Sequence, residues 1–266
     1  MTFVIVILGK AEPPLFSRWE VLPSIEYKNF HRRGDRMKML HNHGNIEVWL
    51  TSLGDEEGEH FIHQYITIRD DHYVHKHKWE PKGGFDQYDA HSVFVILVEG
   101  GVVVAGCRII IEDELIEVPV KEVLRENGLP TNQIPAGAIE ISRFGIRVDR
   151  LELPTWLGPL RRFKTVRRAM RVIPFLLKRR RINRYLNVLT DAIHIYADEH
   201  NYQEAYAVLR ELLANHLEKI GVQFEALPYS ITVKHGKDQF KTVKITGRAQ
   251  AQEYTAPELE VLRRVA

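Results

Sequence analysis

Two runs of β-branched residues separated by a pair of glycines constrain the fold more than any other feature of the chain. Ser92–Glu99 and Val102–Ile111 are rich in valine and isoleucine, and Gly100-Gly101 lies between them. A two-residue glycine joint between such runs predicts a tight antiparallel hairpin. The chain therefore contains antiparallel β-sheet, and the remaining elements must pack against it.

Helix and strand patterns alternate on both sides of this hairpin. Helices are predicted at 61–78 (fraying into a histidine-rich loop), 118–127, 180–200, 211–220 and 258–265, and strands at 47–51, 138–148, 202–209, 222–227, 230–234 and 240–246. This order predicts an α/β (α+β) fold with a mixed, mostly antiparallel central sheet and helices on both faces. We expect an N-terminal extension over 1–58, a main domain over 59–248 with an insert at 150–182, and a C-terminal tail or helix over 249–266.

Composition is consistent with a chain that folds without disulfides. Of 266 residues, 44% are hydrophobic, which is enough for a sizeable core. Cys107 is the one cysteine, so no intrachain disulfide forms, and we expect it to be a small buried side chain in a protein of the reducing cytoplasm. The first apolar run, residues 3–8, is far too short to span a bilayer, and no basic region precedes it.

Charge is distributed very unevenly. The formal net charge is +2, which argues against a protein that coats nucleic acid as a whole. Residues 147–184, however, hold 13 basic and 2 acidic side chains, and the rest of the chain has a net charge of −9. This basic segment fits an acidic protein partner, a solvated amphipathic helix face, or, less well, nucleic acid or an anionic membrane.

Charged residues also interrupt two of the predicted strands. Arg108 lies within the second strand of the hairpin, and Glu140, Ser142 and Arg143 lie within 138–148. Glu140 and Ser142 share one face of a strand, whereas Arg143 points to the other unless a bulge intervenes. Such groups must be paired where they are buried, so they form either an interior ion-pair network, a solvent-facing sheet surface, or a reactive site.

Four segments resemble the acyl-homoserine-lactone synthase family, whose members have a GNAT-type acyltransferase fold. Glu140-Ile141-Ser142-Arg143-Phe144 is similar to the family's E-x-S-R-F segment. The other three are Arg69, Tyr73 and Trp79, similar to R-x-x-x-F-x-x-x-x-x-W; Asp86-Gln87-Tyr88-Asp89, similar to D-x-Y-D; and Gly106-Cys107-Arg108-Ile109, similar to a G-x-x-R-L strand. They occur in the family's order across 61–148. The main domain is accordingly expected to be GNAT-like.

The resemblance implies a reaction. The family transfers a fatty acyl group from acyl-carrier protein, or less often acyl-CoA, to the amino group of S-adenosylmethionine, and lactone closure then releases methylthioadenosine. Glu140 is then the expected general base, poised by Arg69, Arg108 and Arg143. Ser142 would bind substrate or a water, Asp86 and Asp89 would complete an ion-pair network around the acceptor, Tyr73 and Trp79 would order a lid, and the backbone N–H of Phe144 or Gly145 would receive the oxyanion.

An acidic carrier protein also gives the basic segment a role. The expected docking residues are Arg161, Arg162, Lys164, Arg167, Arg168, Arg171, Lys178, Arg179, Arg180 and Arg181. The glycine-rich pyrophosphate loop of acetyl-CoA-dependent GNAT enzymes is missing from 147–154, which favours the carrier protein over CoA.

Alternatives stay open. Related GNAT enzymes that acylate amino acids share a similar strand, and an inactive GNAT-like module could bind acyl-carrier protein, lipid or nucleic acid. The histidines at 60, 63, 72, 75 and 77 invite a zinc site, but no thiolate lies near them, so we expect neither a metal nor a cofactor beyond the two substrates.

Overall fold

The computed structural model describes residues 38–76, 83–147, 164–227, 232–235 and 238–248. Its strands are β1 (Lys38–His43), β2 (Ile46–Ser52), β3 (Ser92–Glu99), β4 (Val102–Ile111), β5 (Ile139–Ile146), β6 (Ala205–Arg210), β7 (Val222–Ala226), β8 (Thr232–His235) and β9 (Asp238–Arg248). Its α-helices are α1 (Glu59–Asp70), α2 (Pro119–Glu126), α3 (Lys164–Glu199) and α4 (Glu211–Lys219), and a π-helical turn, Asp71–Lys76, follows α1.

The strands form a single mixed sheet. Their order is β1-β2-β3-β4-β5-β6-β9-β7, and β8 pairs with β9. Neighbouring strands are antiparallel except β5 and β6, which are parallel. The predicted hairpin is confirmed, because Glu99 pairs with Val102 and the two glycines between them have φ of 61° and 78°, a region in which glycine is favoured. The predicted fold class is also confirmed.

The parallel pair β5 and β6 is joined over a short stretch. Ile139 pairs with Ala205 and Glu140 with Tyr206, and beyond these two positions no pairing connects the described residues of the two strands. The sheet therefore opens along β5 from Ile141 onward, next to the charged residues of that strand.

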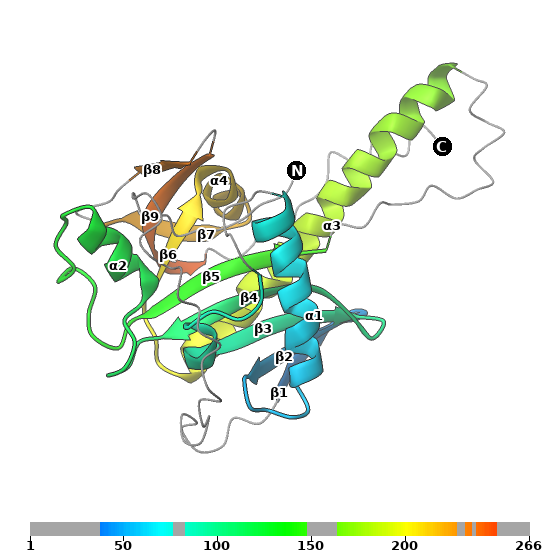
Figure 1. The fold of residues 1–266 in the computed structure, drawn as a ribbon. Helices are drawn as coiled ribbons and strands as arrows, with labels where there is room; N and C mark the ends of the chain where they lie inside the picture. The colour runs from blue at the N-terminus through cyan, green and yellow to red at the C-terminus, as the bar shows by residue number, and fades with distance from the viewer. Residues whose placement is uncertain (1–37, 77–82, 148–163, 228–231, 236–237, 249–266) are drawn as a thin grey trace.

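Helices cover both faces of the sheet, as Figure 1 shows. The alternation of side chains along β3 divides the core in two. Val95 and Leu97 belong to the larger apolar cluster, which includes buried residues of α3 and α4, whereas Phe94 and Ile96 pack with the apolar residues of α1. A third cluster packs α2 against β4, β6 and β9.

Two glycines allow α1 to lie very close to the sheet. A Cβ added at Gly106 on β4 would lie 2.6 Å from Cδ2 of Tyr65, and one at Gly145 on β5 would lie 3.2 Å from Cγ2 of Ile68. The absence of side chains at these positions therefore sets the distance between the helix and the strands that carry the charged residues.

Helix α3 is longer than predicted. It begins at Lys164 rather than at residue 180, and it continues through Pro174, so much of the basic insert is helical. Its N-terminal half extends away from the sheet (Figure 1). Its middle is held at the end of β3. There Tyr185 donates a hydrogen bond of 2.6 Å to Glu99, and Arg181 pairs with the same carboxylate at 3.2 Å.

Part of the predicted N-terminal extension belongs to the sheet. β1 and β2 fall within residues 1–58, and β2 pairs with β3 along its whole length. The rest of that extension before residue 38, the tail 249–266 with its predicted helix, and Trp79 lie outside the described residues. In the part of the chain that the structure describes, no helix is both long and apolar enough to cross a membrane.

Candidate active site

A turn before β3 holds two aspartates against each other. Asp86 accepts hydrogen bonds through Oδ1 from the backbone N–H groups of Tyr88 (2.9 Å) and Asp89 (3.2 Å). Asp89 in return accepts one through Oδ2 from the N–H of Asp86 at 2.7 Å. This reciprocal arrangement is like a capping box, and it fixes the orientation of the two carboxylates relative to each other.

Two buried arginines converge on Asp89. Arg69, in the last turn of α1, donates from Nη1 to both carboxylate oxygens at 2.9 and 3.1 Å, and from Nη2 to the carbonyl of Gly84. Arg108, in the middle of β4, donates from Nη1 to Asp89 at 2.6 Å. Burial alone would raise the pKa of Asp89, but the two guanidinium groups outweigh it and hold that pKa below its usual value.

Arg108 also connects this pair to the neighbouring strand. Its Nη1 lies 2.5 Å from Oδ1 of Asp86, and its Nε donates to the hydroxyl of Ser142 on β5 at 3.2 Å. Arg143, on the same strand, lies 3.4 Å from Asp86 through Nη2. We call Arg69, Asp86, Asp89, Arg108 and Arg143 the charged network; it spans α1, β4, β5 and the turn before β3.

A β-bulge brings Arg143 into this network. Gly106 pairs with Gly145 and Arg108 with Ser142, so that Arg143 and Phe144 both lie opposite Cys107. Arg143 takes a φ of 58°, which is unusual for a residue other than glycine. The bulge therefore places Ser142 and Arg143 on the same face, which the sequence left open, and turns Phe144 into the opposite core.

The π-helical turn after α1 supports the bulge from the other side. The guanidinium of Arg143 lies 4.8 Å from the ring centroid of the fully buried Tyr73. His72, one residue earlier, makes a hydrogen bond of 2.9 Å between its Nε2 and the carbonyl of Ile146 at the end of β5. Tyr73, predicted to order a lid, thus packs directly beneath a predicted catalytic residue.

Glu140 is fully buried next to the network, and its main contact was not predicted. Its Oε2 accepts a hydrogen bond from the backbone N–H of Val120 at 2.6 Å, and its Oε1 is buried without a partner among the described residues. Burial raises the pKa of Glu140 to about 8, although the Val120 N–H and the charge of Arg108 oppose the shift. Of the three arginines predicted to poise Glu140, Arg108 acts on it through its charge, and within the described part of the chain none of the three makes a hydrogen bond to it.

Two further residues next to Glu140 were missed. The hydroxyl of Tyr88 donates to Glu122 on α2 at 2.6 Å, and the guanidinium of Arg108 lies 5.7 Å from the Tyr88 ring. The negative charge of Glu122 adds to the raised pKa of Glu140. Tyr88 stands within the quoted D-x-Y-D segment, so a signal existed for it, whereas the sequence around Glu122 offers none.

Positive charge gathers where β5 and β6 end. The pKa of Lys76 is lowered mainly by burial, then by the charge of Lys178, and least by the charge of Arg210. Burial is the main cause of the lowered pKa of His72, which is bonded to the end of β5, and the charges of Lys76 and Lys178 lower it further. We call Lys76, Lys178 and Arg210 the basic edge.

The structure places the predicted docking residues in different surroundings. Lys178 belongs to the basic edge, and Arg179 and Arg180 follow it on α3 and are exposed. Arg181 instead pairs with Glu99. Lys164, Arg167, Arg168 and Arg171 fall on the first turns of α3 with their side chains outside the described part, and Arg161 and Arg162 lie wholly outside it.

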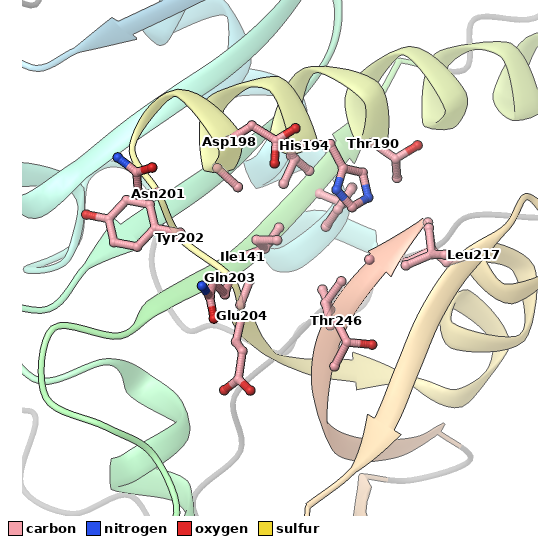
Figure 2. Close-up of a pocket in the computed structure, with 17 residues that line it drawn as sticks. Ile141, Thr190, His194, Asp198, Asn201, Tyr202, Gln203, Glu204, Leu217 and Thr246 are labelled. Atoms are coloured by element: carbon pink, nitrogen blue, oxygen red, sulfur yellow. The ribbon is translucent and has the colours of Figure 1, made fainter. Parts of the chain in front are cut away.

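A cavity of about 430 Å³ lies on the other face of β5, against the C-terminal half of α3. Figure 2 shows it between α3, β5, α4 and β9. Its apolar wall includes Ile141 and Phe144, which belong to the core on the face of β5 opposite the charged network. Its polar residues come mainly from α3 and the loop that follows. Phe144 is the residue of this cavity that was predicted to belong to the site.

Cys107 is buried on β4, as predicted, and burial raises the pKa of its thiol. Over the described residues, no three side chains of histidine, cysteine, aspartate or glutamate are grouped so that they could hold a metal ion.

The fold is similar to those of two solved structures. The AHL synthase LasI is 16% identical, with a TM-score of 0.55, over 80% of this chain and 94% of its own. The CoA-dependent acyl-homoserine lactone synthase BjaI, solved with SAM and isopentyl-CoA, is 18% identical, with a TM-score of 0.50, over 81% of this chain and 87% of its own. No protein-family model and no curated protein matches the sequence. The likeness shows that this chain has the fold of these acyl-homoserine lactone synthases.

Proposed function

We propose that the chain transfers an acyl group from a phosphopantetheine thioester to the amino group of S-adenosylmethionine and closes the product to an N-acyl-homoserine lactone. The observation that carries this proposal is the charged network, which a β-bulge and a π-helical turn assemble on one face of β5 beside a buried, protonatable Glu140. The shared fold with LasI and BjaI supports it. The reaction needs no cofactor beyond its two substrates.

Glu140 is the proposed base for the acceptor ammonium, acting directly or through a water. Its Oε1 has no described partner, so it is free to accept that proton. The freed amine attacks the thioester carbon, a C–N bond forms, and the C–S bond breaks to release the thiol. The oxyanion of the intermediate would be received by the backbone N–H of Phe144 or Gly145, where β6 has separated from β5.

The charged network would hold the acceptor. Asp86 keeps about a fifth of its side chain exposed, while Asp89 and Arg108 are fully buried, so Asp86 is the acid of the network that a cationic substrate could reach. For lactone closure, a carboxylate oxygen of the acceptor attacks the γ-carbon, and the C–S bond to the sulfonium breaks to release methylthioadenosine. Ser142, held by Arg108, would orient the acceptor or a water.

The donor would enter at the basic edge. Lys76, Lys178 and Arg210 lie near the ends of β5 and β6, beyond the last paired residues of the two strands, a place that suits the phosphate of a phosphopantetheine arm. Lys178, Arg179 and Arg180 would then receive an acidic acyl-carrier protein, although the same phosphate is present in acyl-CoA. We place the reaction in the reducing cytoplasm, where an unpaired cysteine such as Cys107 is common.

The purified full chain tests this proposal. It is incubated with S-adenosylmethionine and octanoyl-CoA or octanoyl-acyl-carrier protein, and both products are measured by mass spectrometry. We expect equal amounts of N-octanoyl-homoserine lactone and methylthioadenosine, and the loss of both in Glu140→Gln. An acylated amino acid formed from a supplied amino acid, without methylthioadenosine, would favour the N-acyl amino acid synthase; no product with any acceptor would favour a binding module.

A further inference from the structure

The cavity beside β5 has one wall that the proposed chemistry does not use. Thr190, His194 and Asp198 are spaced four residues apart on α3, so they share one face of that helix. Figure 2 shows them on α3 along one side of the cavity, across from Ile141 and Thr246. The cavity thus combines an apolar wall on β5 with a polar wall on α3.

His194 is the uncommitted group of this wall. Among the described residues its ring makes no hydrogen bond, whereas Thr190 already donates its hydroxyl proton to the carbonyls of Leu186 and Asn187, both at 2.9 Å. Burial lowers the pKa of His194, and the charge of Asp198 opposes that shift only in part. At neutral pH the imidazole is therefore mostly uncharged, with one N–H donor and one nitrogen acceptor to offer.

The cavity also lies where an acyl chain attached at the proposed site would run. Ile141 and Phe144 line it from the strand that carries Glu140 and Arg143. Among the described residues, β5 and β6 are unpaired beyond Glu140 and Tyr206, so no backbone hydrogen bonds join the two strands between the proposed site and the cavity. A plain hydrocarbon chain here would cover His194 without replacing its contacts with water, which costs free energy.

We propose that this cavity selects acyl groups that carry a hydroxyl or carbonyl group far from the thioester, and that His194 recognises that group by a hydrogen bond. The inference rests on the proposed acyl transfer and names the acyl class that the site prefers. Ile141, Phe144 and the other apolar residues would contact the methylene groups, and the polar end would reach α3.

Matched donors test the preference. Hexanoyl, octanoyl and decanoyl thioesters are each compared with their ω-hydroxy counterparts, on both CoA and acyl-carrier protein, with S-adenosylmethionine as the acceptor. For the length that reaches His194, we expect kcat/KM to favour the ω-hydroxy donor by about three- to tenfold, as one neutral hydrogen bond provides. His194→Leu should reverse the preference, and His194→Gln, which keeps a donor and an acceptor, should retain it.

The outcomes separate this inference from the function on which it rests. If lactone forms but no ω-hydroxy donor is preferred at any length, or if His194→Leu leaves the ratio unchanged, the selection by His194 is wrong and the acyl transfer stands. If no donor on either carrier yields lactone, the proposed function is wrong and the inference falls with it. Thermal melting of both variants checks that a changed ratio does not reflect unfolding.

Discussion

The carboxylate of Glu140 accepts a hydrogen bond of 2.6 Å from the backbone N–H of Val120. Val120 is the second residue of α2, after Pro119, so this N–H is one that the helix leaves without an internal partner. A helix N-terminus favours the ionised carboxylate, while full burial favours the protonated acid, and the balance is a pKa of about 8. Glu140 is thus held by a fixed donor and can still change its protonation state near neutral pH.

This balance predicts how activity depends on pH. Only the ionised form of Glu140 can take a proton from the acceptor, so kcat/KM should rise with pH and level off above about 8. A profile measured from pH 6 to pH 9.5 with a fixed acyl donor checks it, with Glu140→Gln as the inactive reference. A profile that is already level at pH 6 would contradict the raised pKa.

Stability provides an independent readout of the same group. Because the folded-state pKa lies above that of the unfolded chain, folded Glu140 binds more protons, and its contribution to stability is lost as the pH rises from about 4.5 to about 8. Glu140→Gln has no such titration. The difference in melting temperature, Glu140→Gln minus wild type, should therefore increase as the pH rises through that range. This measurement needs no substrate.

Arg143 should separate backbone strain from chemistry. A φ of 58° costs an ordinary residue roughly 1 kcal/mol, and glycine avoids that cost. We expect Arg143→Gly and Arg143→Ala to lose acyl transfer equally, since both remove the guanidinium above Tyr73. In urea unfolding, the glycine variant should be more stable than the alanine variant by about 1 kcal/mol. Equal stabilities would contradict the strained bulge, and retained activity would contradict a role for the side chain.

Asp89 should be the residue of the charged network on which stability depends most. It is fully buried and bonded to both Arg69 and Arg108. Asp89→Asn therefore removes the negative charge that balances the positive charges of two buried guanidinium groups. We expect a loss of about 3–5 kcal/mol in the free energy of unfolding. The control is Asp113→Asn, whose partner His91 lies at a more exposed site and which should lose about 1 kcal/mol or less. Similar losses in both variants would show that the network does not support the fold.

The three basic residues of α3 that we propose to receive the carrier protein predict a salt effect on the donor. Lys178→Glu, Arg179→Glu and Arg180→Glu combined should lower kcat/KM for acyl-carrier protein by about tenfold at low ionic strength and remove most of its salt dependence, with little change in kcat. Arg125→Glu, at an exposed position of α2, serves as the control. An unchanged salt dependence in the triple variant would place docking elsewhere.

Local patterns predicted much of this fold. The β3–β4 hairpin and α4 were predicted correctly. Glycines and changes of hydrophobic periodicity mark the ends of such elements in the sequence, because they affect the backbone within a few residues. The grouping of Arg69 with Asp89 and Arg108 followed from a resemblance that covers the segments carrying all three. The start of α3 was placed too late, since Pro174 and the many basic residues hid a helix that continues through them.

What could not be predicted depends on pairing between distant segments. The bulge at Arg143 exists because two residues of β5 face Cys107 of β4, and no property of the pentapeptide alone reveals that register. The contact between Val120 and Glu140 depends in the same way on how α2 packs against the sheet. The polar wall of the cavity depends on which face of α3 points into it. That orientation is set by the packing of α3 on the sheet rather than by the local sequence.

Gly106 links the packing of α1 to the bulge, and this relationship gives the last prediction. A Cβ at this position would lie 2.6 Å from Cδ2 of Tyr65, whose hydroxyl donates a hydrogen bond to the carbonyl of Arg143. Gly106→Ala must therefore move Tyr65, which should cost about 1–3 kcal/mol of stability and should also reduce activity through the bulge. Gly247→Ala is the matched control for stability, because its Cβ would meet no atom closer than 3.5 Å. Urea unfolding of both variants and product formation by Gly106→Ala check the link. A Gly106→Ala protein that loses stability but keeps full activity would show that Tyr65 does not hold Arg143 in place.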